Sequence, residues 1–447
     1  MKSRDPAVLG WFGIVRLGLV QSAIGAIVML ATSLLNRVMV VEFALPAALP
    51  AGLVAWHYAV QLSRPAWGHR SDRGRRRTPW ILFGMAMLAL GAMLAVMAVG
   101  PLADRSGWGL VLAVLAFTLI GFGVGAAGTS LLALLATRVA PERRPAAAAI
   151  TWIMMIAGIV VTAGVAGALI DPFSLSRLTA VAGGVAGAAF LVSVAAIWGV
   201  EGGGVASSSP VRAVAPVPAF GDAVRAMWAD DDARRFTIFV FLSMLAYSMQ
   251  DLILEPFAGL VFGMSPGEST KLSGLQHAGV LAGMIVVGVA GGGFARRAGG
   301  AGGLRRWIVG GCVGSAVALG GLAVAARVGP GWPLSANIAL LGFANGVFAV
   351  AAIGSMMSLA GAGGDGEGGR EGTRMGVWGA AQAIAFGLGG LIGAVGVDVG
   401  RALTGSTTGT FLVVFGAEAL LFLLAASLAL RGAPRPAVAW PAAGEPA

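Results

Sequence analysis

Long apolar stretches alternate with short polar segments along almost the whole chain. Each stretch has about 20 predominantly apolar residues, the length that an α-helix needs to cross the ~30 Å hydrocarbon core of a bilayer. The pattern therefore predicts twelve membrane-spanning helices. The expected spans are residues 12 to 36, 46 to 67, 79 to 100, 108 to 136, 146 to 170, 178 to 200, 236 to 255, 272 to 294, 307 to 327, 333 to 360, 374 to 397 and 408 to 430.

The composition agrees with a membrane protein. Of the 447 residues, 57% are hydrophobic and 11% are charged, and the mean hydropathy is +0.86, whereas soluble domains carry about 25% charged residues. The first apolar stretch is too long for the core of a signal peptide, so we expect it to stay as an anchor. A single cysteine, Cys312, excludes an intrachain disulfide and a multi-cysteine metal site.

The positive charge is unevenly distributed between the two ends of the predicted spans. A formal net charge of +10 would suggest a nucleic-acid partner in a soluble protein, but basic residues of a membrane protein gather in cytoplasmic loops. With the N-terminus inside, 23 of the 30 Lys and Arg residues lie on the inner side and 6 on the outer side, and Arg16 lies within the first span. We therefore expect both termini to be cytoplasmic and no nucleic acid to bind.

A stretch rich in Gly, Ser, Pro and Asp interrupts the apolar pattern near the middle of the chain and is typical of a linker. It separates six expected spans from six others, an arrangement that suggests an internal duplication. The predicted organisation is a first bundle at residues 1–200, a cytoplasmic linker at 201–234, a second bundle at 235–431 and a flexible cytoplasmic tail at 432–447.

The two halves can be aligned at the ends of their first spans. R-V-M-V-V-E-F at residues 37 to 43 matches Q-D-L-I-L-E-P-F at residues 250 to 257, so that Glu42 corresponds to Glu255 and Val38 to Asp251. The second half carries about eleven more residues between this acid and the matched glycine of the next loop, Gly292, than the first half has before Gly68. Asp251 and Pro256 therefore belong to the second half alone.

The loop after the second expected span reads G-H-R-S-D-R-G-R-R-R. It resembles the signature G-x-x-x-D-R-x-G-R-R of the major facilitator superfamily, with one residue fewer between Arg73 and Gly74. The resemblance implies a latch that holds the two halves together when the cytoplasmic side is shut; the alternative is that the arginines only enforce topology. The candidate latch residues are Gly68, Asp72, Arg73, Gly74, Arg75 and Arg76.

Several further stretches narrow the resemblance to one branch. They are N-R-V-M-V-V-E, W-H-Y-A-V-Q-L-S-R-P-A-W-G-H-R-S-D, R-R-R-T-P-W-I, W-I-M-M-I-A-G and Q-D-L-I-L-E-P-F-A-G-L-V-F-G-M-S-P-G-E-S-T. Together they resemble the PucC and LhaA family, the bacteriochlorophyll-delivery branch of the superfamily, from about residue 10 to residue 430.

This resemblance implies twelve transmembrane helices in two six-helix bundles with the major facilitator fold. It also implies an assembly factor for light-harvesting antenna complexes in the bacterial inner, intracytoplasmic photosynthetic membrane. The implied ligand is bacteriochlorophyll, carried and not covalently bound, and the implied partners are membrane lipid, the antenna α and β polypeptides and enzymes of bacteriochlorophyll synthesis. The alternatives are a secondary transporter of a small or amphipathic molecule, and a pigment-free chaperone for antenna helices.

Two histidines within the expected spans could bind such a pigment. The central magnesium of a chlorin takes one axial ligand, typically a neutral histidine nitrogen or an oxygen donor. His57 and His277 occupy related positions in the two halves, offset by four residues, with Gln61 and Gln276 close to them in sequence. All four are candidate pigment-binding residues; the alternative is that the histidines form hydrogen bonds between helices.

A second candidate site is polar and lies in the outer part of the spans. Its residues are Arg37, Glu42, Asp251, Glu255 and Pro256. Charges at this depth cost several kcal/mol unless they are paired or protonated, so we expect Asp251 to face the interior. Pro256 disfavours helical geometry at Glu255, which predicts a helix end there. The acids could form a proton or ion site, a polar anchor for pigment or antenna polypeptide, or a structural bridge to Arg37 or a helix end.

Motifs of catalysis are absent from the sequence. It has no phosphate-binding Gly-Lys loop, no nucleophile triad and no cluster of metal ligands. We therefore expect a protein that is not an enzyme.

The 71 glycines predict close packing between transmembrane helices.

Overall fold

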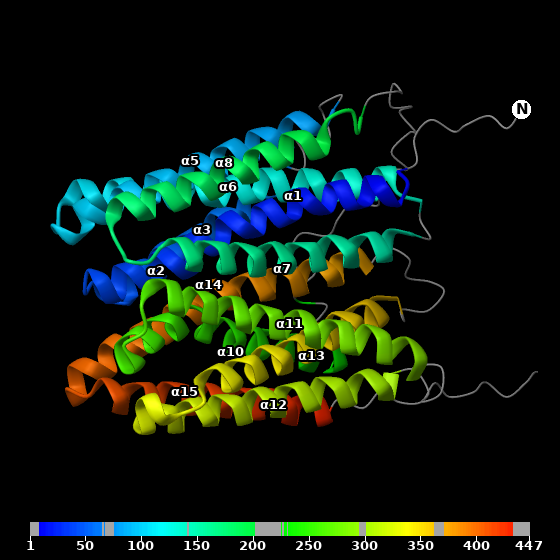
Figure 1. Ribbon diagram of the computed structural model, residues 1–447. Helices are drawn as coiled ribbons and strands as arrows, with labels where there is room; N and C mark the ends of the chain where they lie inside the picture. Colours follow the sequence, from blue (N-terminus) through cyan, green and yellow to red (C-terminus); the bar gives the residue numbers. More distant parts are fainter. Residues whose placement is uncertain are drawn as a thin grey trace, which may run out of the picture.

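The computed structural model describes residues 9–64, 67, 76–140, 143–201, 225, 228–229, 231–294, 301–361 and 371–431, and all regular structure within them is helical (Figure 1). The α-helices are α1 (Trp11–Met29), α2 (Leu35–Arg37), α3 (Ala48–Val60), α5 (Thr78–Ala103), α6 (Gly107–Arg138), α7 (Arg144–Leu169), α8 (Leu175–Ile197), α10 (Asp231–Phe262), α11 (Pro266–Phe294), α12 (Ala301–Val328), α13 (Leu334–Gly361), α14 (Glu371–Thr404) and α15 (Thr407–Arg431).

Ten helices in the described ranges are long and apolar enough to cross a membrane, and each coincides with one expected span. The expected spans at 46 to 67 and 272 to 294 have no counterpart among the ten. The helix α3 has 13 residues, about 20 Å at 1.5 Å per residue, and α11 begins with a polar turn at residues 266 to 271. The structure confirms an all-helical, multi-pass membrane protein, with ten rather than twelve such spans in the part described.

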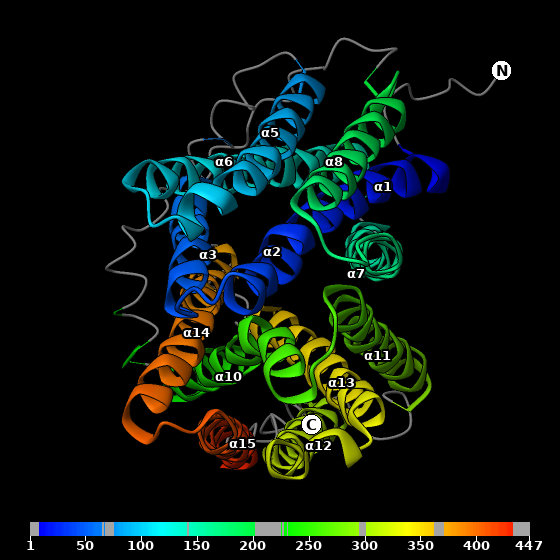
Figure 2. The ribbon, with the colours of Figure 1, turned by 60° about the vertical axis from the view of Figure 1, so that its left-hand side comes forward.

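The two halves of the chain occupy different parts of the molecule. Figure 2 shows α1 to α8 in its upper part and α10 to α15 in its lower part. Helices of the two halves pack against each other mainly in two pairs, α7 with α11 and α3 with α14. The expected linker, apart from Glu201 and parts of residues 225–234, and the expected tail lie outside the described residues.

Short turns join the helices at one end of the molecule, on the left of Figure 1. We call this the short-turn end; it comprises residues 43–47, 104–106, 170–174, 263–265, 329–333 and 405–406. The sequence predicts that it faces away from the cytoplasm.

The first helix of each half is longer than the apolar pattern predicts. α1 continues through a π-helical turn (Leu30–Leu34), α2 and a second π-helical turn (Val38–Glu42). In the second half, α10 passes through Pro256 and ends at Phe262, so the expected helix end at Glu255 is wrong. Glu42 is the last residue of its helix, whereas Glu255 lies two turns before the end of α10.

Glycines bring several helices into close contact, as the composition predicts. A Cβ atom at Gly123 would lie 2.7 Å from the carbonyl oxygen of Gly84, and one at Gly121 would lie 2.8 Å from that of His57. A side chain at Gly342 would collide with the backbone of Gln276. Gly121 thus lets α6 approach α3, and Gly342 lets α13 approach α11.

Candidate functional site

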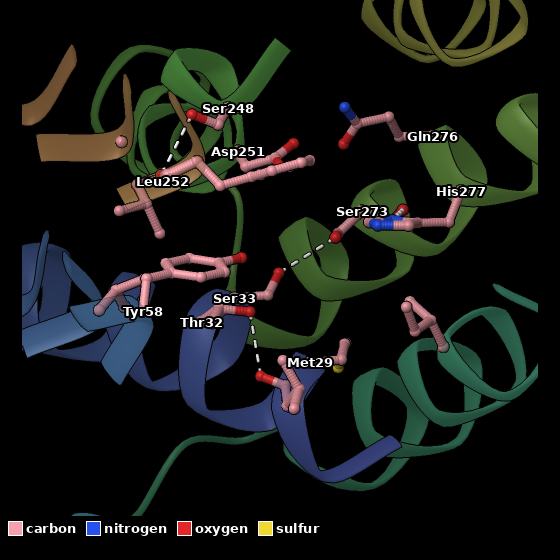
Figure 3. A pocket seen from close by; sticks show the side chains of 15 residues that line it. Met29, Thr32, Ser33, Tyr58, Ser248, Asp251, Leu252, Ser273, Gln276 and His277 are labelled. Atoms are coloured by element: carbon pink, nitrogen blue, oxygen red, sulfur yellow. Dashed lines mark hydrogen bonds between the residues drawn. The ribbon is translucent and has the colours of Figure 1, made fainter. Parts of the chain in front are cut away.

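A cavity of about 80 Å³, lined by both polar and apolar side chains, lies between the two halves. A volume of this size accommodates a few water molecules. Its polar lining comes from the first helix (Thr32 and Ser33), α3 (Tyr58), α10 (Ser248 and Asp251) and α11 (Ser273, Gln276 and His277). Figure 3 shows these side chains converging on the space between the helices.

Asp251 and Gln276 face each other across this cavity (Figure 3). In the described part of the chain, Asp251 Oδ1 and Gln276 Nε2 are buried and have no hydrogen-bond partner. Gln276 is only 3% exposed. Buried polar groups are rarely left without partners, so this pair offers an acceptor and a donor to a molecule in the cavity.

His277 presents one nitrogen that is free to act as a ligand. Its Nδ1 lies 2.9 Å from the backbone oxygen of Ser273. Because a carbonyl oxygen can only accept, Nδ1 carries the proton and the lone pair of the neutral ring is on Nε2. A backbone carbonyl that fixes a histidine in this tautomer is the usual arrangement behind a metal-binding Nε2.

His57 and Gln61 lie outside the cavity, although the sequence analysis names them as candidate pigment-binding residues together with His277 and Gln276. His57 is 2% exposed, and its Nε2 lies 2.8 Å from Gln61 Nε2. Nε2 therefore accepts from the amide, and Nδ1 carries the proton without a partner among the described residues. The lone pair of His57 is already used by Gln61, just after the end of α3, and its neighbour Tyr58 lines the cavity instead.

Glu255 has several partners, unlike Asp251 one turn before it. Its carboxylate accepts from Ser33 Oγ, from Thr270 Oγ1 at 3.4 Å and from Ser269 Oγ at 3.5 Å. All three donors are buried. These hydrogen bonds join α10 to the first helix of the other half and to α11.

Arg37 pairs with Glu42 and not directly with either acid of α10. Its Nε donates to Ser269 Oγ at 3.1 Å and its Nη2 donates to the backbone oxygen of Met264. The hydroxyl of Ser269 thus lies between the guanidinium of Arg37 and the carboxylate of Glu255. Arg37 is 1% exposed, and its contacts with the second half form a bridge at the short-turn end.

The continuity of α10 at Pro256 depends on the other half. Proline has no N–H, so the carbonyl of Leu252, four residues earlier, loses its helical donor. Asn36 Nδ2 donates to this oxygen at 2.7 Å, and Asn36 is 1% exposed. The amide replaces the missing donor, which explains why the helix does not break.

Two carboxylates at the short-turn end cap helices of the opposite half. Asp398 of α14 accepts from the backbone N–H groups of Ala47 at 3.0 Å and Ala48 at 2.7 Å, at the start of α3. Asp171, after α7, accepts from Gly267 N at 3.1 Å and from Ser265 Oγ at 2.5 Å, at the start of α11. Carboxylates are favourable at helix N-termini, and these contacts hold the halves together.

The candidate latch at Gly68 to Arg76 is outside the described residues except for Arg76, whose side chain is exposed. Next to it, Glu201 accepts from Arg77 N at 2.9 Å and from Thr78 N at 2.9 Å and so caps α5. Burial raises the pKa of the Glu201 carboxyl, but the hydrogen bonds from Arg77 and Thr78 outweigh it and the pKa is lowered overall. The sequence analysis does not identify this cap. The signal in the sequence is an acidic residue directly after the sixth expected span.

Two charged residues of the spans have different surroundings. Arg16 donates to the backbone oxygens of Ala196 at 2.8 Å and Trp198, at the end of α8. Glu418 in α15 is fully buried, and neither of its carboxylate oxygens has a hydrogen-bond partner among the described residues.

The described residues also contain no group of three or more His, Cys, Asp or Glu side chains that could hold a metal ion.

Comparison with protein-family models shows to which family the chain belongs. The family model for "PUCC protein" matches residues 34–433. The chain belongs to the PucC family. The family resemblance that the sequence motifs indicate is thereby confirmed.

Two relatives of this PucC-family chain come from Rhodobacter capsulatus. One, the "Bacteriochlorophyll synthase 44.5 kDa chain", is 52% identical over 432 residues, which cover 96% of this chain and 98% of the relative. The other, "Protein PucC", is 31% identical over 437 residues, covering 93% and 91%. The name of the first relative places it in a synthase, so the prediction of a protein that is not an enzyme is contradicted.

Solved structures with the same fold are transporters of the major facilitator type. A bacterial homologue of the human lysosomal transporter Spinster, described as inward-facing and unoccupied, gives a TM-score of 0.67 at 14% identity and covers 94% of this chain and 96% of that one. The nucleoside transporter NupG gives 0.68 at 11% identity, covering 94% and 99%. These similarities support the major facilitator fold.

Proposed function

We propose that this protein binds bacteriochlorophyll and delivers it to antenna polypeptides, as an assembly factor for light-harvesting complexes in the bacterial inner membrane. Membership of the PucC family and a relative named for bacteriochlorophyll synthesis support a role in this system. The observation that carries the proposal is the cavity between the halves, where His277 has a free Nε2 beside Asp251 and Gln276.

The chemistry of this lining suits a chlorin. The magnesium of the pigment would take His277 Nε2 as its axial ligand, and the ring carbonyls would accept from the amide of Gln276. The cavity of about 80 Å³ is smaller than the 300–1,000 Å³ or so of pockets that hold drug-sized ligands. The proposal therefore requires the two halves to move apart before the pigment enters.

The proposed partners are the antenna α and β polypeptides, bacteriochlorophyll-synthesis enzymes and membrane lipid. The synthase name of the relative supports action close to pigment synthesis. A chain that works beside such enzymes would receive an apolar pigment without releasing it into water.

A second candidate function is transport of a small polar molecule or ion. The small cavity with its unpartnered Asp251 oxygen favours it, because the cavity already suits a ligand of that size. The fold is compatible with either function and does not discriminate between them.

The test compares His277→Leu with His57→Leu, which serves as a matched control in the other half. Each variant is purified in mild detergent from a pigmented phototroph, and the bacteriochlorophyll bound per protein is measured by absorbance. We expect His277→Leu to lose most of the pigment and His57→Leu to keep it.

Other outcomes of this purification contradict the proposal. Equal pigment in both variants would remove His277 as the ligand. A wild-type protein that carries antenna peptide without pigment would identify a pigment-free chaperone, and one that carries neither would favour the transporter.

A further inference from the structure

A second hollow lies on the outer surface of the first half, between α7 and α8. It has a volume of about 410 Å³ and shares no lining residue with the central cavity. Leu169 of α7 and Arg177, Ala180, Val181, Gly184 and Ala188 of α8 contribute to its lining. Apart from Arg177, all these side chains are apolar or absent.

The lining residues of α8 form a straight path along one helical face. Arg177, Val181, Gly184 and Ala188 are spaced by three or four residues and so share that face. The path from Arg177 to Ala188 covers eleven residues, about 16 Å at 1.5 Å per residue. This is close to half of the ~30 Å hydrocarbon core, so the groove has the length of one leaflet.

The groove ends in a cation at the short-turn end. Arg177 Nη1 donates to the backbone oxygen of Asp171, and no carboxylate pairs with Arg177 among the described residues. A guanidinium without a counter-ion near the end of a candidate membrane span is suited to a phosphate, which it can bind with two N–H groups.

The floor of the groove is kept open by Gly184. A Cβ atom there would have no heavy atom within 4 Å, so the absence of a side chain does not serve helix packing. Gly187, one turn along α8, is equally open but does not line the groove.

We propose that this groove binds one anionic phospholipid of the leaflet at the short-turn end, with its phosphate at Arg177 and one acyl chain along α8 to Ala188. The length of the path fits an acyl chain, and the unpaired Arg177 favours a headgroup with a net negative charge. Asp171, whose carbonyl contacts Arg177, also caps α11, so the lipid lies beside a contact between the two halves.

The experiment uses the full chain in detergent, after delipidation, with phosphatidylglycerol or phosphatidylcholine added back. Bound lipid is counted by native mass spectrometry, and the unfolding midpoint is recorded with each lipid. The wild type is expected to retain one phosphatidylglycerol and to gain a few degrees in midpoint, with a smaller gain from phosphatidylcholine.

Three variants distinguish the groove from ordinary lipid around the protein. Gly184→Leu should fill the groove and abolish the retained lipid, and Arg177→Gln should remove the preference for phosphatidylglycerol. Gly187→Leu, which adds the same side chain in open space on α8, should behave as the wild type does.

Two results would overturn the assignment. If Gly184→Leu and Gly187→Leu retain the same phosphatidylglycerol as the wild type, the groove is not a lipid site. If Gly184→Leu instead loses bacteriochlorophyll that the protein carried from the cell and its phospholipid is unchanged, the occupant is pigment and not phospholipid.

Discussion

Asp251 and Glu255 lie one turn apart on the same helix and have opposite environments. Glu255 accepts hydrogen bonds from Ser33, Ser269 and Thr270, whereas Asp251 Oδ1 has no partner in the described part of the chain. Both acids are in the segment that the sequence singles out as unusual. The contrast indicates that Glu255 joins the two halves. The carboxyl oxygen of Asp251 remains available to hydrogen-bond a molecule that enters the cavity.

The largest effect on stability is expected from Glu255→Ala. The substitution removes the buried acceptor shared by Ser33, Ser269 and Thr270 and opens a void, which should cost about 2–4 kcal/mol. Ser33 keeps its contact with Ser273, and Ser269 keeps the carbonyl of Pro266. The unfolding midpoint in detergent measures this loss, and Asp251→Ala is the matched control with a much smaller decrease. Equal decreases in the two variants would contradict the contrast between the acids.

A smaller effect is expected from Asn36→Leu, which removes the donor to the Leu252 carbonyl between the two acids. A buried acceptor left without a partner costs about 1–3 kcal/mol. In a Pro256→Ala background the backbone N–H of residue 256 is restored, so the same Asn36→Leu change should cost much less.

This double-mutant cycle is measured by the unfolding midpoints of the four proteins. An identical cost of Asn36→Leu with and without Pro256 would show that the amide does not replace the missing donor.

The smallest effect on stability is expected from Asp251→Asn. The side chain keeps its shape and loses only its ability to ionise, and no hydrogen bond to Oδ1 is lost among the described residues, so stability should change by less than about 0.5 kcal/mol. Antenna assembly per protein should nevertheless fall by roughly tenfold, equivalent to about 1.4 kcal/mol of lost ligand interaction.

The absorbance of antenna complexes in membranes measures that fall, with the amount of the variant quantified on the same membranes. Normal antenna levels in Asp251→Asn would mean that its free oxygen has no role in assembly.

The sequence predicts ten of its twelve spans in agreement with the described helices, because long apolar runs are local features of the chain. It also identifies the acids of α10 and both histidines of the helices. It predicts a helix end at Glu255 wrongly, because the donor that keeps α10 continuous is Asn36, from a distant part of the chain.

The assembly of the site is likewise not readable from spacing along the chain. His57 and His277 have related positions in the two halves, yet only His277 lines the cavity, whereas His57 Nε2 is hydrogen-bonded to Gln61. The capping roles of Asp171 and Asp398 leave no recognisable motif in the sequence, because their partners include backbone N–H groups of the opposite half.

The amide of Asn36 also has a consequence for the biogenesis of the protein. The ribosome makes the first half before the second, and domains generally fold in that order. When α10 enters the membrane, its Leu252 carbonyl is without a donor, which is unfavourable in lipid, and the first half already presents the amide that satisfies it. Because of Pro256, docking of the newly inserted α10 against the first half is energetically favourable before the rest of the second half is complete.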